Sequence, residues 1–263
     1  MAKYYKLLNS FDNTLFSFAA GGKAAVNYGL DQVINAPNWL AEKGYHLCVY
    51  SDLFNVARLA TGIMKKMSAQ LWEVEAEECE SIPKPACLIE LDWGIIRSVG
   101  THRVWPIGTR MVKNLRLIRQ VTDEELRAAV AEKRYYKIML ELNGKLESYA
   151  TDLRVGGITY STTEVNNASD NLYNEGYHLF AFETLKQLCT VFFDKWSPAL
   201  SVVYQVTGEQ VDLKPLRHWC VTPKGEVLWT VSELRPAYDG TVMLKNVRLV
   251  ERVTTAQLEY VNS

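Results

Sequence analysis

Four stretches in the first half of the chain have the apolar and polar pattern of β-strands. They are predicted at residues 3–8, 45–50, 71–75 and 110–121. The second stretch begins directly after a glycine and is rich in aromatic and β-branched residues, which favour strands. Apolar and polar positions alternate around Leu115 in the last stretch, and this alternation indicates a half-exposed strand.

Two helices are predicted from capping residues and from the spacing of apolar positions. Ser51 and Asp52 can cap the first helix, and six apolar residues then share one face: Leu53, Val56, Ala57, Ala60, Met64 and Met67. Thr122-Asp-Glu-Glu125 is a capping box, in which the threonine and the last glutamate each satisfy a free backbone N–H group. The box predicts a second helix over residues 123–133.

The chain then repeats itself at a nearly constant offset. Three segments recur 131 or 132 positions later: 3–8 as 134–139, 44–47 as 176–179, and 111–118 as 243–250. Isolated identities fall on the same diagonal: Asn35 with Asn167, Leu40 with Leu172, Val74 with Val206, Glu77 with Glu209, and Leu126 with Leu258. One single-residue insertion aligns the two halves from end to end, so the chain is a tandem duplication.

This pattern predicts an α+β fold made of two tandem copies of one unit. Each unit should hold a mixed or antiparallel sheet with short helices, because the regular strand–helix alternation of a doubly wound sheet is absent from the sequence. The predicted organisation is a first repeat at 1–122, a linker helix at 123–133 and a second repeat at 134–263.

Composition and charge narrow the classes of partner. The 263 residues are 48% hydrophobic and carry a formal net charge of -1, which gives no electrostatic basis for binding nucleic acid. No apolar run is long enough to span a bilayer, and the first residues lack the apolar core of a signal peptide. The five cysteines form no CxxC pair. We therefore expect a cytoplasmic protein with reduced thiols and without a structural zinc site.

The Gly-Tyr-His-Leu segment is the first candidate for a ligand-binding site, because both copies contain it. On a strand, the tyrosines Tyr45 and Tyr177 point away from the face that holds His46 and His178. The histidines either lie in a cleft, as acid–base or ring-stacking groups, or are half-buried structural residues. The structural interpretation is favoured, since the sequence fixes no acid or nucleophile beside them.

Acidic residues supply the second candidate. The run 73–78 contains two Glu-x-Glu steps, but only Glu77, matched by Glu209, persists in the second copy. These carboxylates would share one face of a strand, where they could act in acid–base catalysis or bind a metal. A charged edge strand that discourages aggregation is the favoured interpretation.

The Lys-Asn-x-Arg sequence also recurs, at 113–116 and 245–248. We expect its asparagines to close a turn or to bond to neighbouring backbone at a strand start, and its arginines to be solvated. No group of His, Cys and Asp has metal-ligand spacing, and neither a hydrolase motif nor a glycine-rich phosphate loop is present. No catalytic residue and no metal is therefore predicted. The most divergent stretch, 79–110 against 211–242, holds four tryptophans that we expect to be mostly buried: Trp93, Trp105, Trp219 and Trp229.

Residues 43–57, Lys-Gly-Tyr-His-Leu-Cys-Val-Tyr-Ser-Asp-Leu-Phe-Asn-Val-Ala, and the following Leu71-Trp-Glu-Val-Glu-Ala carry a family resemblance. They resemble an uncharacterised domain common in bacteriophage and prophage proteins, with a Gly-Phe-His-Phe-Cys core, a helix and a Val-Glu-Val strand. They are more distantly similar to the core of the ADP-ribosyltransferase fold. Both resemblances cover about the first 75 residues of each copy and rest on short motifs.

The transferase resemblance implies an ADP-ribosyltransferase-like scaffold with room for a nucleotide. It places the NAD-stacking tyrosine of that family on His46 and His178. The family's first-strand His or Arg, expected near Tyr5, and its final catalytic Glu, expected near Leu115, have no counterpart in either copy.

Two functions follow as expectations. The first is a non-catalytic interaction protein, encoded by a phage under the resemblance, that binds a host or virion protein or a nucleotide-like ligand and needs no cofactor. It would act in the host cytoplasm or in association with the virion. The alternative is an ADP-ribosyltransferase-like enzyme that uses NAD and has displaced catalytic groups, His46 or His178 with Glu77 or Glu209. The sequence leaves the oligomeric state of the protein open under both functions.

Overall fold

The computed structural model divides the chain into two compact units, Met1–Glu132 and Lys133–Ser263, each of which is described by itself. The described residues are 2–17, 21–22, 25–64, 69–80, 87–91, 94–98, 104–149, 157–192, 200–214, 216–221, 227–235 and 238–262. Within them, the side chains of 21–22, 59, 61–64, 87–91, 94–98, 192, 216–221 and 227–235 are not described.

Apart from β3, the elements described in the two units follow the same order, as the duplication predicts. The first unit contains β1 (Ala2–Phe11), β2 (Thr14–Ser17), β3 (Gly21–Gly22), β4 (Asn27–Tyr28), α1 (Asn38–Ala41), β5 (Leu47–Tyr50), α2 (Leu53–Met64), β6 (Ala69–Glu78), β7 (Cys87–Leu91), β8 (Gly94–Ser98), β9 (Thr109–Gln120) and α3 (Asp123–Ala131). The second contains β10 (Tyr135–Leu142), β11 (Lys145–Ser148), β12 (Thr159–Tyr160), α4 (Asp170–Asn174), β13 (Leu179–Phe182), α5 (Leu185–Phe192), β14 (Ser201–Val211), β15 (Leu216–Val221), β16 (Val227–Arg235), β17 (Thr241–Val253) and α6 (Thr255–Asn262).

The main sheet of each unit closes into a ring. In the first unit, β1 pairs with β5, β5 with β9, β9 with β6, and β6 with β1, all antiparallel. The β2–β4 hairpin extends β1, and a bridge between Ile34 and Leu115 joins the chain after β4 back to β9. The second unit has the equivalent pairings and a bridge between Asn166 and Val247. Closure leaves few free strand edges, which protects a sheet against pairing with other chains.

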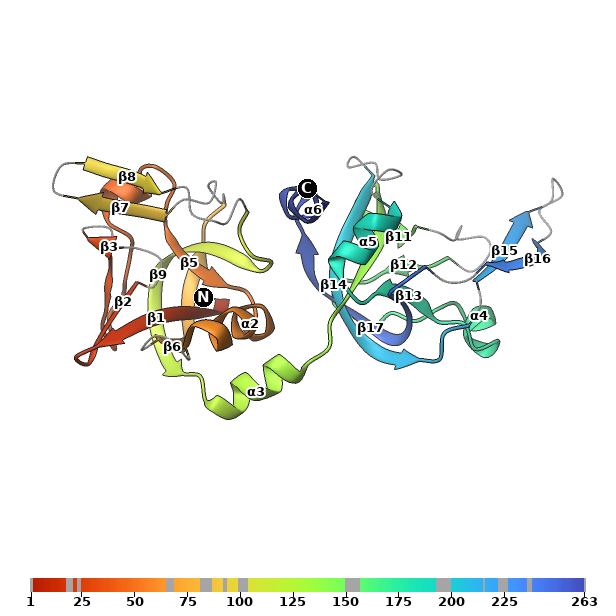
Figure 1. Ribbon diagram of the computed structural model, residues 1–263, viewed down its shortest axis with the longest axis horizontal. Coiled ribbons are helices and arrows are strands. Elements are labelled where there is room, and N and C mark those ends of the chain that lie inside the picture. Colours follow the sequence, from red (N-terminus) through yellow and green to blue (C-terminus); the bar gives the residue numbers. More distant parts are fainter. Residues whose placement is uncertain are drawn as a thin grey trace. The chain divides into compact units, whose positions relative to one another are not determined.

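The expected α+β class, with mixed, mostly antiparallel sheets and few short helices, is confirmed (Figure 1). Among the described strands, the β3–β7 pairing is the parallel one. The divergent stretches 79–110 and 211–242 each contain a hairpin, β7–β8 and β15–β16. Of their four tryptophans, Trp105 is half-buried, and the other three side chains lie outside the described ones.

The interior of each ring is filled by apolar side chains that alternate along its strands. The first core includes Leu8, Val49, Val74, Val112 and Leu115, all fully buried. The second core is built from equivalent positions, among them Met139, Ala181, Val206, Leu244 and Val247.

Helices α2 and α3 pack outside the first ring (Figure 1). Val56, Ala57 and Ala60 of α2 join Leu126 and Ala129 of α3 in a second core cluster, as the helical spacing predicts. The predicted capping box is present at Thr122, whose hydroxyl accepts from the N–H group of Glu125. The predicted linker helix therefore packs as the last element of the first unit. α6 ends the second unit in the same way, in contact with α5. None of the helices in the described part of the chain is long and apolar enough to cross a membrane.

Two bulges in β9 recur in β17. Glu77 faces Lys113 and Glu75 faces Arg116. Two residues of β9, Asn114 and Leu115, therefore lie opposite the single residue Ala76 of β6. The first of the two is Asn114, which has a left-handed φ of 52°. Asn246 has the same conformation in β17, with a φ of 54°. Asparagine tolerates this region better than other side chains because its amide bonds locally, so the recurrent asparagine marks a bulge within the strand. The expectation that these asparagines close a turn is wrong, because both lie inside a strand.

Candidate functional site

Residues that persist in both copies fall into two groups, and the first group serves the fold. Lys6 is buried, and its ammonium group donates to the carbonyl of Cys48 at 2.6 Å. Lys137 is buried in the same way and donates to the carbonyl of Phe180 at 2.6 Å. Each ammonium also lies over a tyrosine ring, with 5.5 Å from Lys6 to Tyr28 and 5.3 Å from Lys137 to Tyr160. These contacts explain why the Tyr-Tyr-Lys strand recurs.

The recurrent asparagines hold the bulge. The backbone N–H of Asn114 donates to Oδ1 of Asn35 at 2.7 Å, and Nδ2 of Asn35 donates to Oδ1 of Asn114 at 3.1 Å. Asn246 and Asn167 make the same two bonds at the same two distances. A reciprocal amide pair therefore fixes the left-handed residue in both rings, which accounts for the conservation of both asparagines.

The glycine of Gly-Tyr-His-Leu ends a helix. Gly44 has a φ of 81°, and its N–H donates to the carbonyl of Ala41. The N–H of Tyr45 donates to the carbonyl of Leu40. This pair of bonds is the Schellman motif, which requires a residue with positive φ. In the second copy Gly176 has a φ of 76°, and the N–H of the buried Tyr177 donates to the carbonyl of Leu172. The two tyrosines are thus placed by a helix end, Tyr45 half-buried and Tyr177 buried.

The second group lies on the outer surface of the ring. The pairing of Leu47 with Val112 brings His46, one residue earlier, next to Lys113, one residue later. Lys113 in turn faces Glu77 on β6, with 3.9 Å between its ammonium and the carboxylate. His46 is half-buried, while Lys113 and Glu77 are about half exposed. The three form one row across three strands, which we call the first His-Lys-Glu row.

The second copy builds the same row from His178, Lys245 and Glu209. The Lys245 ammonium lies 3.0 Å from the Glu209 carboxylate, which also accepts from Nδ2 of Asn246 at 2.8 Å. These bonds from Asn246 and Lys245 lower the pKa of Glu209. Its carboxylate raises the pKa of Lys245. Burial and the positive charges of Lys245 and Lys214 lower the pKa of His178. At neutral pH the row therefore holds a neutral imidazole beside an ion pair.

Two more exposed residues persist beside each row. Arg116 and Arg248 are exposed, as expected from their place on the strand. The Ile34–Leu115 bridge puts Val33 next to Arg116, and Val33 is 48% exposed. Its counterpart Val165 is 39% exposed. We call each row together with its arginine and valine the repeated patch. These valines do not stand out in the sequence, although both copies contain them at the same offset.

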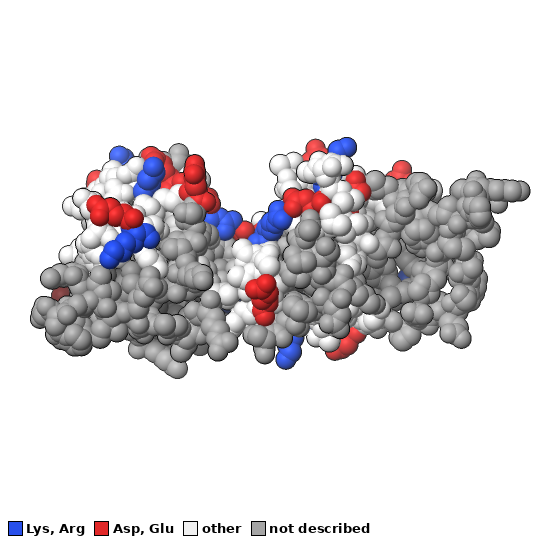
Figure 2. Space-filling model, turned by 90° about the horizontal axis from the view of Figure 1, so that it is seen from above, with Lys and Arg blue, Asp and Glu red and all other residues white. Residues whose placement is uncertain are grey.

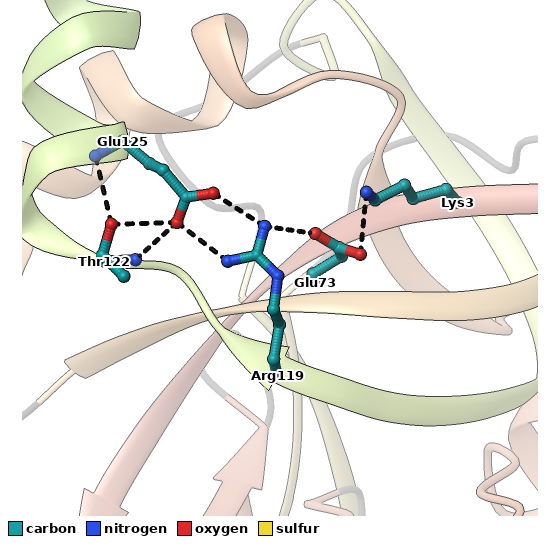
Figure 3. Close-up of polar contacts among 5 residues, drawn as sticks. All are labelled: Lys3, Glu73, Arg119, Thr122 and Glu125. Carbon is teal, nitrogen blue, oxygen red and sulfur yellow. Dashed lines mark hydrogen bonds and ion pairs between the residues drawn. The ribbon is translucent and has the colours of Figure 1, made fainter.

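The other acidic residues of the run 73–78 do not all belong to this patch. Glu73 is buried and lies 2.8 Å from both Lys3 and Arg119, and Arg119 binds Glu125 at 2.7 Å (Figure 3). Because β6 is paired on both sides, by β1 and β9, the favoured interpretation of a charged edge strand is wrong.

This charged cluster changes between the copies. Gln205 stands at the position of Glu73 and accepts from Arg134 at 3.1 Å. Glu251 takes the position of Arg119, facing Gln205 as Arg119 faces Glu73. A residue set that changes its charges while the ring is retained serves local stability, in contrast to the patch, whose residues are the same in both copies.

In the second row, the bonds from Asn246 and Lys245 that lower the pKa of Glu209 make its carboxylate a weaker base. Within the described residues, no group of three or more His, Cys, Asp or Glu is arranged to hold a metal ion. Comparison with protein-family models, curated proteins and solved structures finds no match for this chain.

Proposed function

We propose that this chain is a non-catalytic interaction protein that binds a protein partner through its repeated patches. The observation that carries the proposal is the identity of five outward-facing residue pairs at equivalent positions of the two rings: Val33 and Val165, His46 and His178, Glu77 and Glu209, Lys113 and Lys245, Arg116 and Arg248.

Folding alone does not account for this identity. An exposed ion pair contributes about 0–1 kcal/mol to stability, and surface substitutions usually change it by less than about 0.5 kcal/mol. The buried charges around Glu73 changed between the copies even though buried groups are more costly to alter. Residues that contribute little to the fold yet stay the same in both copies are best explained by a shared binding task.

The chemistry of the patch suits a protein surface. Each patch combines one carboxylate, two cations, an imidazole and an aliphatic side chain. Figure 2 shows acidic and basic side chains close together on the described surface, not a broad field of one sign. Mixed polar groups around an apolar contact are typical of protein–protein interfaces, whereas nucleic-acid surfaces are dominated by positive charge.

The proposal includes a phage origin and action in a host cytoplasm or virion, because residues 43–57 resemble the bacteriophage and prophage domain. Under it the partner is a host or virion protein. Two patches on one chain would also let a partner that presents its epitope twice bind with avidity, without any additional contact.

The test is capture of a partner from a lysate of the native host. The test variant carries Lys113→Ala, Glu77→Ala, Lys245→Ala and Glu209→Ala. The control carries Glu124→Ala and Lys186→Ala, which remove two exposed charges whose counterparts in the other copy are Ala256 and Phe54. A protein captured by wild type and control, and lost with the test variant at unchanged thermal stability, supports the proposal. Equal capture by all three contradicts it.

A parallel assay separates the enzyme alternative. Wild type and the double variant His46→Ala/His178→Ala are incubated with labelled NAD and lysate. If wild type transfers label and the variant does not, the function is ADP-ribosyl transfer and not binding alone. Absence of NAD binding in calorimetry excludes the NAD-dependent alternative and leaves the capture result to decide.

A further inference from the structure

His178 lies among positive charges contributed by two separate elements. Lys245 belongs to β17 and is part of the second row, whereas Lys214 lies in the segment that follows β14. The pairing of Leu179 with Leu244 brings His178 next to Lys245, and the Lys214 ammonium lies over the ring of Tyr177, the residue before His178. Burial, followed by the positive charges of Lys245 and Lys214, lowers the pKa of His178. Lys214 is half-buried, so it is held close to the protein surface instead of extending into solvent.

The contacts of Lys214 hold it in place. Its ammonium donates to the backbone carbonyl of Glu175 and lies 5.2 Å from the ring centroid of Tyr177. A carbonyl and a ring are neutral, so neither contact cancels the charge. Lys245, by contrast, is paired with the Glu209 carboxylate.

The imidazole of His178 is also held in place. Its ring meets Tyr173 edge-on, with 4.6 Å between centroids and an interplanar angle of 86°. Its Nδ1 atom is buried and has no hydrogen-bond partner in the described part of the chain. A fixed imidazole loses little side-chain freedom when a ligand binds beside it.

We infer that His178, Lys214 and Lys245 form an oxyanion site in the second unit, which takes a phosphate group or a carboxylate. Lys214 adds a second ammonium group to the Lys245–Glu209 pair, and the imidazole adds a hydrogen-bonding group. Charge-assisted hydrogen bonds of this kind are the usual way in which proteins hold phosphate and carboxylate oxygens.

The site uses a residue that the two copies do not share in sequence. Lys214 comes from the divergent stretch 211–242, and the residue 132 positions earlier is Ile82, which lies outside the described residues. The first row has His46 and Lys113 but no lysine at that sequence position. The inference thus goes beyond the proposed function, which rests on residues that the copies share.

Inorganic phosphate is the first probe, read by NMR on the full chain. The chain has four histidines, so the imidazole C–H signals are few, and the signal lost in His178→Gln identifies His178. Phosphate bound beside the ring favours the protonated imidazole, so it should move the His178 titration midpoint to higher pH. Sodium chloride at matched ionic strength is the reference, because screening of the lysines acts in the same direction.

The variants test the site itself. Lys214→Met should weaken phosphate binding about fivefold (~1 kcal/mol), the Coulomb attraction of one charge pair in water. Lys245→Ala should also weaken it, while the exposed Lys186→Ala should not. Circular dichroism checks that each variant keeps its fold.

Two further probes, acetate and a nucleoside monophosphate, define the source of the anion. Equal shifts by acetate and phosphate indicate a general oxyanion site, and a shift by phosphate compounds alone indicates a phosphate site; both results support the inference. A His178 midpoint that stays at its chloride value with all three probes overturns it. An equal movement of the His46 signal, or a shift that survives Lys214→Met unchanged, also overturns it.

Discussion

The ammonium nitrogen of Lys6 lies 2.6 Å from the carbonyl oxygen of Cys48, forty-two residues further along the chain. The bond joins β1 to β5 at the seam where those strands share a single residue pair, Tyr5 with Tyr50. The second unit repeats it with Lys137 and Phe180 across a seam that is equally short. A side chain thus supplements the backbone pairing that closes each ring.

Replacing this lysine by methionine should destabilise the unit. Lys6→Met keeps the length of the side chain but removes the donor to the Cys48 carbonyl, which is expected to cost about 1–3 kcal/mol in the free energy of unfolding. Denaturation in urea measures the change. Lys145→Met, on the exposed surface of β11, is the control and should stay within about 0.5 kcal/mol of wild type. Equal stability of the two variants would show that the seam bond is dispensable.

Replacing Asn114 by glycine should reduce stability less than replacing it by alanine. Asn114→Gly adopts the positive φ freely and loses only the side-chain bond to Asn35, a loss of about 0.5–1.5 kcal/mol. Asn114→Ala loses the same bond and adds the strain of a left-handed residue, about 1–2 kcal/mol more. The expected order of urea midpoints is wild type, glycine, alanine. An alanine variant as stable as the glycine one is incompatible with the left-handed bulge.

Acid should weaken the first unit through Glu125. Bonds from Arg119 and from the Thr122 cap lower the pKa of Glu125 to about 2. Because the folded pKa is below the unfolded one, its contribution to stability is complete above pH ~4.5 and is lost as pH falls toward 2. Glu125→Gln retains a capping box like the one that Gln257 makes in the second unit, but it removes the charge.

Thermal unfolding across this pH range measures the effect. Wild type should exceed Glu125→Gln in midpoint temperature at pH 7, and the two should converge near pH 2. A difference that stays constant over the whole range would assign the effect to the cap instead of the ion pair with Arg119.

Each half of the chain should fold alone. The stretches Met1–Glu132 and Lys133–Ser263 each contain a closed ring, a separate core and a final helix. Expressed separately, both should show β-rich circular dichroism and a cooperative urea transition. A half that unfolds without cooperativity would show that it depends on the other for its stability.

Local patterns in the sequence predicted the elements better than they predicted their connections. The main strands, the helix after Asp52 and the capping box at Thr122 were found, because each is encoded within a few neighbouring residues. Closure of the ring was missed, since it depends on pairings between distant segments. The burial of Lys6 was also missed, because lysine is almost always exposed and only its three-dimensional partners make burial tolerable.

The candidate site was predicted in part. His46 and Glu77, with their counterparts, were candidates from the duplication alone, and Lys113 was noted as recurrent. What joined them was the register of β5, β9 and β6, which no local pattern contains. Lys214 could not be found by comparing the copies, since it belongs to the stretch that diverged.

The final helix of each unit also bears on the ancestry of the chain. Because α3 packs on the ring and helix of its own unit, and α6 packs on α5 of the second unit, each copy has its own final helix. A gene for a single copy would already have encoded a whole domain, and two such chains could have worked side by side before fusion. Fusion then allowed the copies to diverge in the stretches 79–110 and 211–242, the second of which holds Lys214, while both kept the repeated patch.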